Sequence, residues 1–214
     1  MIPVKILAVR YLANASPGLA RSLGAPEGYP ALGMITTDCD DATYIALDEA
    51  TKAADVQVCY ARSFYAGASN ASTPNAGEVI GILVGPTPGA VRSGMEAAIS
   101  ALGRIGFEEV QGVPYLAHTV ASVGTFLARE AGVREGSALA YLRAPPLEGM
   151  YGLDFAMKAA EVKLCKLYGP PSETNFGGGL LSGTQSACDA ARIAFADAVA
   201  EVAKGPIDNC WAGS

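Results

Sequence analysis

The sequence predicts an α/β chain in which one domain occurs twice in tandem, and three observations support this prediction. The segment 46–59 reads against 152–165 with the same residue at more than half of its positions. Further upstream, 19–28 reads against 127–136 at nearly the same offset. Segments whose apolar residues are spaced as in a strand also alternate with segments whose apolar residues are spaced as in a helix, and the order is the same in both halves. We therefore expect two related units, each a sheet with helices packed on one face.

The stronger of the two matches sets the register between the halves. Its identical pairs are Leu47/Leu153, Asp48/Asp154, Ala50/Ala156, Lys52/Lys158, Ala53/Ala159, Ala54/Ala160, Val56/Val162 and Cys59/Cys165. A period of roughly half the chain is too long for a solenoid repeat, so the sequence predicts domains at 1–108 and 109–214. Because a fused pair of like domains usually replaces two subunits of a symmetric ring, we expect a building block of an assembly.

In the first half, each expected element has a local signal. The opening segment alternates as a strand does, and the short helix after it is expected to end at Gly24. The central helix has one apolar face, and Asp40 or Asp41 is expected to cap its N-terminus. Thr87 and Pro88 predict the start of the last helix. The expected order is a strand at 4–10, a helix at 17–23, a strand at 31–36, a helix at 42–54, strands at 56–64 and 79–84, and a helix from 88 to about 102.

The second half repeats this plan. The expected order is a strand and helix within 115–131, a strand at 138–143, a helix at 151–160, a strand at 162–168, a loop at 169–177, a strand at 178–182 and a helix at 184–202. One loop of the first half, 64–78, is longer than its counterpart. A loop that differs between two copies is where function has room to diverge.

Composition excludes several classes of protein. Of the 214 residues 50% are hydrophobic and only 17% are charged, which predicts extensive contact surfaces. A net charge of −6 without a basic cluster argues against a nucleic-acid partner. The chain lacks an apolar run long enough to span a bilayer and a secretory signal at its start. Five cysteines without a CxxC pair fit reduced thiols, so we expect a cytoplasmic protein with no membrane partner.

The residues also argue against an enzyme and predict no cofactor. The single histidine, His118, has no acid, cysteine or second histidine at a catalytic or zinc-binding spacing. Ser182 and Ser186 do not form a nucleophile elbow, and no phosphate-binding glycine motif is present. A calcium loop is rejected because Thr43 replaces its essential glycine. Four cysteines are expected to be small buried apolar residues: Cys39, Cys59, Cys165 and Cys188.

Several strings of residues resemble bacterial microcompartment shell proteins. In each half a strand and helix come first, whereas the commonest shell domains place them last, so the order resembles the circularly permuted tandem type. The strings that carry the resemblance are 31–35, 52–56, 158–162, 38–44, 61–68, 144–148 and 170–175, and the last four are similar to the ethanolamine-utilisation branch. The resemblance covers essentially the whole chain. It implies a ferredoxin-like α+β fold and a homotrimer that tiles with other shell proteins around a gated central pore.

The resemblance also implies which residues serve the pore and the tile edge. The pore loops would be 63–77 and 172–179, whose small residues impose little steric restriction, as a gate requires. The pore residues it implies are Phe64, Tyr65, Asn70, Ser72, Asn175, Phe176, Gly177 and Gly178. Lys52 and Lys158 would lie at the tile edge, packing their aliphatic stems while the charge stays exposed. Three-fold symmetry would multiply any pore cysteine, so a thiol-ligated metal or cluster there remains open.

Members of this branch bind ethanolamine, a ligand proposed to favour the closed pore. Carried over to this chain, the site would comprise Asp41, Glu78, the backbone around Phe107, and Ser182. Carboxylates suit the ammonium group, and a hydroxyl suits the ligand's own hydroxyl. Helix capping by Asp41 and an exposed strand end at Glu78 are the alternatives for the two acids. The pore would pass a metabolite such as ethanolamine or a larger cofactor. The alternative function is a trimeric small-molecule-binding regulator of the same fold that never forms sheets.

Overall fold

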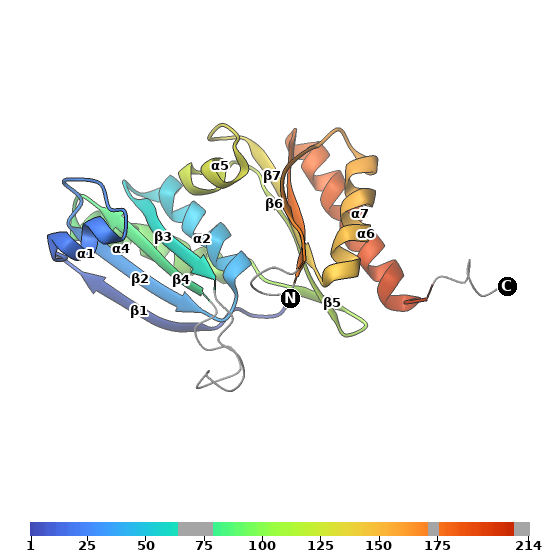
Figure 1. Cartoon of the computed structure of the whole chain (residues 1–214), viewed down its shortest axis with the longest axis horizontal. Helices are drawn as coiled ribbons and strands as arrows, with labels where there is room; N and C mark the ends of the chain where they lie inside the picture. The colour runs from blue at the N-terminus through green and yellow to red at the C-terminus, as the bar shows by residue number, and fades with distance from the viewer. Residues whose placement is uncertain (64–78, 171–175, 208–214) are drawn as a thin grey trace. The chain divides into compact units, whose positions relative to one another are not determined.

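The computed structural model describes residues 1–63, 79–170 and 176–207 (Figure 1). It is a mixed α/β chain, as predicted, in which the strands of each sheet are antiparallel. None of the helices in these ranges is long and apolar enough to cross a membrane.

The chain divides into two compact units. The N-terminal unit comprises Pro3–Gly106 together with Val123–Glu130. The C-terminal unit comprises Met1–Ile2, Phe107–Ser122 and Ala131–Ser214. A short stretch of the second sequence half therefore packs with the first.

The sheet of the N-terminal unit has four strands in the order β1-β2-β4-β3. The strands are β1 (Ile6–Leu12), β2 (Ala31–Thr37), β3 (Gln57–Ser63) and β4 (Val79–Gly85). In the centre of the sheet β2 pairs with β4 so that Ile35 lies opposite Gly81. All four predicted strands of this half are confirmed, with ends shifted by one or two residues.

Helices α2 (Asp40–Ala53) and α4 (Pro88–Leu102) cover one face of this sheet. Two glycines allow them to approach closely. A Cβ at Gly81 would lie 2.5 Å from Leu47 of α2, and one at Gly33 would lie 2.7 Å from Val91 of α4. Side chains larger than hydrogen at these strand positions would push the helices off the sheet.

The short helix α1 (Pro17–Ser22) covers the opposite face of the same sheet. Leu32, Ile82 and Val84 point away from α2 and α4, and Ala20 of α1 packs against them. The prediction that the helices share one face is therefore wrong for α1. Strand side chains alternate between faces, and apolar residues at both sets of positions on β2 and β4 require a cover on each side.

The predicted helix ends are partly confirmed. α1 is capped at Leu23, and Gly24 follows with φ of 80°, as expected for a left-handed end. Thr87 caps α4, and its hydroxyl accepts a hydrogen bond of 3.1 Å from the Ala90 N–H. Neither Asp40 nor Asp41 occupies the capping position of α2, but the Asp40 carboxylate accepts a hydrogen bond of 2.8 Å from the Asp41 N–H in the first turn.

Cys39 occupies the capping position of α2 and makes no side-chain capping bond. Asp40 and Asp41 instead lie buried in the first turn, where the positive end of the helix dipole favours negative charge. The hydroxyl of Thr43 donates to the Cys39 carbonyl at 2.8 Å, and the Cys39 N–H donates to Thr37 at 3.1 Å. Two threonine hydroxyls and the Asp40 carboxylate therefore satisfy backbone groups at this turn.

Helix α5 (Thr125–Ala131) packs on α2 within the N-terminal unit. The carboxylate of Asp48 is fully buried and accepts hydrogen bonds from the Gly124 N–H at 2.7 Å and the Leu127 N–H at 2.8 Å. The hydroxyl of Thr51 accepts a third from the Thr125 N–H at 3.1 Å. One helix therefore caps the N-terminus of another. Burial raises the pKa of Asp48, and the two backbone donors offset part of that rise.

The C-terminal unit repeats the topology and adds one strand, with the order β5-β6-β7-β9-β8. The last four match β1-β2-β4-β3 position by position, so the duplicated fold is confirmed. The elements of this unit are β5 (Glu108–Val110), β6 (Val113–Val120), β7 (Ala138–Ala144), α6 (Pro146–Ala159), β8 (Lys163–Tyr168), β9 (Gly177–Gly183) and α7 (Gln185–Lys204).

Two features of this unit differ from the prediction. β5 was not expected; it forms a hairpin with β6 through Gln111 and Gly112, which both have positive φ. Helix α6 begins at Pro146, five residues before the predicted start, because proline suits the first helical turn. α6 and α7 cover one face of the sheet around a core that includes Phe195 and Leu153, as predicted for this half.

Candidate functional site

The two predicted pore loops arise at equivalent places in the repeats. The first joins β3 to β4, where Ser63 lies opposite Val79 at the end of the ladder. The second joins β8 to β9, where Tyr168 lies opposite Gly178. Both are therefore hairpin connections between matching strands. Predicted pore residues outside the described ranges are Phe64, Tyr65, Asn70, Ser72 and Asn175.

The other three predicted pore residues, Phe176, Gly177 and Gly178, are described, and the two glycines lie in strand β9. Gly178 belongs to the strand predicted at 178–182, whereas Gly177, predicted to end the loop, already lies in this strand. Gly178 has φ of 140°, and a Cβ there would lie 2.0 Å from the Leu142 carbonyl oxygen. A Cβ at Gly149 of α6 would lie 2.7 Å from the backbone of Gly177. The glycines are needed for close packing at the base of the hairpin.

Aromatic and cationic side chains gather at this hairpin base. The guanidinium of Arg143 lies 4.4 Å from the ring centre of Tyr168, and Lys166 lies 5.2 Å from the same ring. The Phe176 ring lies 5.3 Å from the Phe107 ring. Arg143 is buried in the otherwise apolar strand β7, which was the signal that the sequence reasoning missed. Cation–π contacts of this kind hold the strand that enters the loop.

The four predicted ligand residues are distributed over both units. Asp41 lies buried on α2 in the N-terminal unit, and Glu78 lies outside the described residues. Phe107 and Ser182 belong to the C-terminal unit. The Phe107 carbonyl accepts a hydrogen bond of 2.5 Å from the Ile2 N–H, and the Ser182 hydroxyl donates to the Ala138 carbonyl at 3.0 Å. Both groups already have protein partners, and the serine hydroxyl keeps capacity to accept.

The two predicted tile-edge lysines lie in the last turns of equivalent helices. Lys52 forms an ion pair of 2.5 Å with Glu49 on α2, and Lys158 forms one of 2.6 Å with Asp154 on α6. Lys158 is the more exposed of the two. Each pair lies on the surface of one helix, where such contacts stabilise it by only about 0.2–0.5 kcal/mol.

Of the four cysteines that were expected to be buried, only one is fully buried. Cys188 lies in the core of the C-terminal unit, whereas Cys39, Cys59 and Cys165 are partly buried. Burial raises the pKa of Cys59 to about 11 and also raises the pKa values of Cys39 and Cys188. These three thiols stay protonated at neutral pH, so they are poor nucleophiles and metal ligands. Across the described ranges, no three His, Cys, Asp or Glu side chains are grouped to hold a metal ion.

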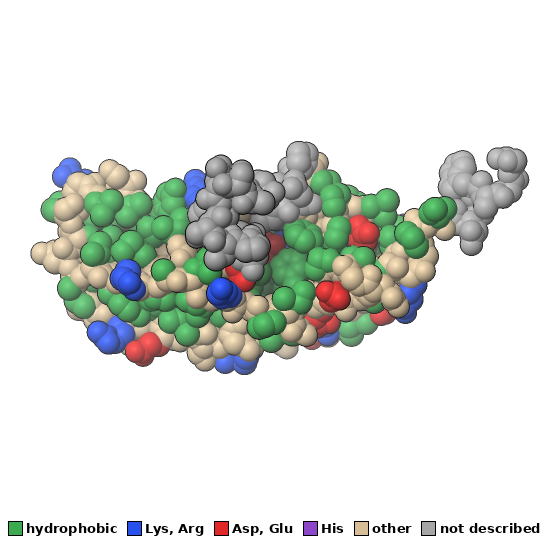
Figure 2. Space-filling model, turned by 90° about the horizontal axis from the view of Figure 1, so that it is seen from below, with side chains coloured by type: hydrophobic (Ala, Val, Ile, Leu, Met, Phe, Trp, Pro, Cys, Tyr) green, Lys and Arg blue, Asp and Glu red, His purple; other side chains and the backbone are tan. Residues whose placement is uncertain are grey.

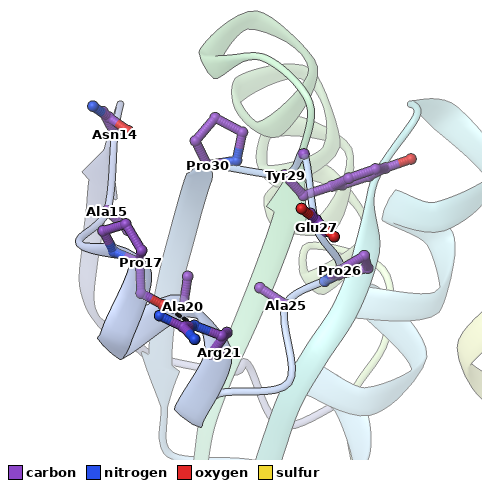
Figure 3. Close-up of a pocket in the computed structure, with 11 residues that line it drawn as sticks. Asn14, Ala15, Pro17, Ala20, Arg21, Ala25, Pro26, Glu27, Tyr29 and Pro30 are labelled. Carbon is purple, nitrogen blue, oxygen red and sulfur yellow. Dashed lines mark hydrogen bonds between the residues drawn. The ribbon is translucent and has the colours of Figure 1, made fainter.

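A cavity of about 590 Å³ lies between α1 and the segment that follows it (Figure 3). Ala20 and Arg21 line it from the helix, and Pro26, Glu27 and Tyr29 line it from the other side. None of the residues singled out from the sequence as pore, ligand or tile-edge residues borders this cavity.

Hydrophobic side chains also cover much of the surface. In Figure 2 they spread over one face of the molecule, and charged side chains interrupt them singly. The large apolar side chains with substantial exposure include Leu19, Leu147, Phe155, Met157 and Leu167. The folded chain therefore exposes large apolar side chains, as an extensive contact surface requires.

Known proteins with the same sequence pattern are shell proteins. Residues 31–114 match the BMC domain family. The bacterial microcompartment shell protein EutL of Clostridium perfringens is 54% identical over 211 residues, which cover 97% of each chain. EutL of Escherichia coli is 46% identical over 213 residues, covering 98% of this chain and 97% of that one.

Solved structures agree with the sequence matches. The crystal structure of EutL from Leptotrichia buccalis superposes with a TM-score of 0.92 at 53% identity and covers 97% of both chains. A trimeric shell protein, PduB, superposes with a TM-score of 0.77 at 18% identity, covering 94% of this chain and 89% of that one, which shows a shared fold. These relatives are structural proteins and not enzymes. Because the identity reaches 54% over 97% of each chain, this chain belongs to the EutL family of bacterial microcompartment shell proteins.

Proposed function

We propose that this shell protein assembles as a homotrimer, and that the trimer is a tile with a gated central pore. The observation that carries the proposal is the duplicated fold, in which each repeat sends a hairpin connection from the same pair of strands. A three-fold axis would bring two such connections from every chain to the centre. PduB, which shares the fold, is described as trimeric, and this supports the same state here.

The pore is proposed to be bordered by 64–78 from one repeat and by 171–175 with Phe176 from the other. The close-packed Gly177 and Gly178 hold the base of the second hairpin, so any gating movement is confined to the segments beyond it. The first connection is much the longer, and it is the better candidate for the moving part. A metabolite or a larger cofactor would pass when it is displaced.

A small amine such as ethanolamine is proposed to bias the gate, with Asp41, Glu78, Phe107 and Ser182 as the ligand set. Asp41 supports this proposal, because a buried carboxylate gains most from a cationic partner. The spare acceptor capacity of Ser182 suits the hydroxyl group of the ligand. The ligand shifts the gate only by the difference between its affinities for the closed and open states.

The edges of the tile are proposed to include Lys52 and Lys158, and the two shell domains are proposed to span 1–108 and 109–214. Lys158, the more exposed lysine, has a free aliphatic stem to lay across a neighbouring tile. The non-tiling regulator shares the trimer and the pocket but predicts discrete particles at every protein concentration.

Two experiments test the proposal. Electron microscopy of the full chain at high concentration should show flat hexagonal arrays or rolled sheets; only separate particles would favour the regulator. Titration calorimetry with ethanolamine should show binding that Glu78→Gln weakens at least tenfold, while the exposed control Glu96→Gln leaves it unchanged. Equal binding by both variants would remove Glu78 from the site.

A further inference from the structure

The cavity beside α1 is large enough to hold a small molecule and lies apart from the proposed pore and amine site. Its volume of about 590 Å³ falls within the range of small-molecule sites, about 300–1,000 Å³. All of its lining residues lie between Asn14 and Pro30, within the N-terminal unit. The cavity therefore belongs to one unit of one chain, and its lining depends on neither the pore nor the trimer.

The walls of the cavity are held in place by the chain itself. Pro17, Pro26 and Pro30 line it with rings that fix the backbone angle φ at their positions (Figure 3). The Ala15 N–H donates a hydrogen bond of 2.8 Å to the Pro30 carbonyl, and the Tyr29 N–H donates one of 3.3 Å to the Pro26 carbonyl. Because these constraints exist before a ligand arrives, the entropic cost of binding is low.

The first repeat differs from the second in residues that shape this cavity. In the register of the upstream match, Ala25 corresponds to Val133, whose branched side chain takes more space. Tyr29 and Pro30 precede strand β2, where the second repeat has only Ser137 before strand β7. These differences widen the space and add two ring-bearing walls in the first repeat.

Opposite charges line the cavity from its two sides. Arg21 lines it from α1, and Glu27 lines it from the following segment, on the same side as Tyr29 (Figure 3). Both charged side chains are exposed, and within the described ranges neither forms an ion pair with another side chain. The Arg21 Nε–H donates to the Pro17 carbonyl at 3.4 Å, which leaves the terminal guanidinium N–H groups for a ligand. The cavity therefore offers a cation on one side and an anion on the other.

We propose that this cavity binds a small zwitterion whose carboxylate and ammonium groups stand at opposite ends of an apolar body. The carboxylate binds Arg21 and the ammonium group binds Glu27, through charge-assisted hydrogen bonds. The apolar body packs against the proline rings, and the ring of Tyr29 also attracts the ammonium group.

The placement of the two charges selects among ligands. An α-amino acid carries both of its charges at one end, so it reaches Arg21 or Glu27 but not both. A carboxylate without an ammonium group is repelled by Glu27, and an amine without a carboxylate is repelled by Arg21. Because solvent screens exposed charges, each ion pair is expected to change the affinity by about threefold to fivefold.

Titration of the full chain by saturation-transfer NMR tests the two-ended recognition. The probe is ε-aminocaproate, and norleucine is its matched control because the two isomers differ in where the ammonium group is attached. The dissociation constant of ε-aminocaproate should be about threefold to fivefold lower than those of norleucine, caproate and hexylamine. Equal affinities for the two isomers would overturn the proposal.

Charge variants locate each end of the ligand. Arg21→Gln should weaken binding of ε-aminocaproate and caproate by about threefold to fivefold and should not weaken binding of hexylamine. Glu27→Gln should weaken binding of ε-aminocaproate and hexylamine to the same extent and should not weaken binding of caproate. Glu96→Gln, at an exposed position of α4 outside the cavity, is the control and should change none of these affinities. Binding of ε-aminocaproate that neither cavity variant changes would place the ligand elsewhere and overturn the proposal.

Two further measurements separate this cavity from the proposed amine site. Ala25→Val introduces the residue of the second repeat and should weaken binding of ε-aminocaproate by filling the space, while circular dichroism stays unchanged. Excess ethanolamine should not displace ε-aminocaproate from the full chain. Displacement would assign the probe to the proposed amine site and overturn the zwitterion site. A chain that binds ε-aminocaproate but not ethanolamine would overturn the amine site and leave the zwitterion site standing.

Discussion

Replacing Asp48 with asparagine tests the junction between α2 and α5 most sharply. The carboxylate accepts two hydrogen bonds, of 2.7 and 2.8 Å, from backbone N–H groups in a fully buried place. An asparagine of the same shape offers one acceptor oxygen and turns its amide N–H toward the second donor. One backbone N–H is then left buried without a partner.

The size of the effect follows from these contacts. Hydrogen bonds to charged groups contribute about 1.5–3 kcal/mol each, and an unsatisfied buried donor costs about 1–3 kcal/mol. Removing the buried charge returns part of this loss, because a carboxylate is costly to desolvate. We therefore expect Asp48→Asn to lower the free energy of unfolding by about 2–3 kcal/mol.

Urea unfolding of the full chain, followed by circular dichroism at fixed protein concentration, measures this change. With an m-value of about 2 kcal/mol/M, the midpoint should fall by about 1–1.5 M. Glu96→Gln on the exposed side of α4 is the matched control and should stay within about 0.5 kcal/mol. A midpoint shift as small as that of the control would refute the assignment of Asp48 as the cap of α5.

Two further predictions concern other parts of the chain. Gly178→Ala should lower the free energy of unfolding by about 2–4 kcal/mol, and with it the melting temperature, because its Cβ meets a backbone carbonyl. Gly169→Ala, with open space around its Cβ, is the control and should leave the melting temperature unchanged. Equal melting temperatures for the two variants would contradict the close packing of β9. Iodoacetamide at pH 7.5 should label Cys165 well before Cys59, because burial raises the pKa of the Cys59 thiol to about 11. Peptide mass spectrometry measures the order of labelling, and the reverse order would contradict the burial of Cys59.

The elements with local signals were predictable from the sequence. The duplicated segments fixed the order of strands and helices, and Thr87 and Gly24 marked helix ends because capping depends on the nearest few residues. The start of α2 was not predictable, since three adjacent polar residues compete there and the extended Cys39 occupies the cap. β5 was missed because three residues carry no measurable period.

The site was predictable only in part. The positions of the two hairpin connections follow from the repeats, but the role of Gly177 and Gly178 depends on α6 and β7, which lie far away in the sequence. Asp48 and Asp154 occupy equivalent positions in the two matching segments, yet one is buried and the other exposed. Tertiary contacts decide that difference, and local pattern holds no record of them.

The central claim is that three copies close around an axis bordered by the two hairpin connections. Electron cryomicroscopy of the purified full chain tests it most directly. The account predicts a three-fold ring with 64–78 and 171–175 facing the central opening. A monomer, or a ring whose axis is bordered by other segments, would contradict it.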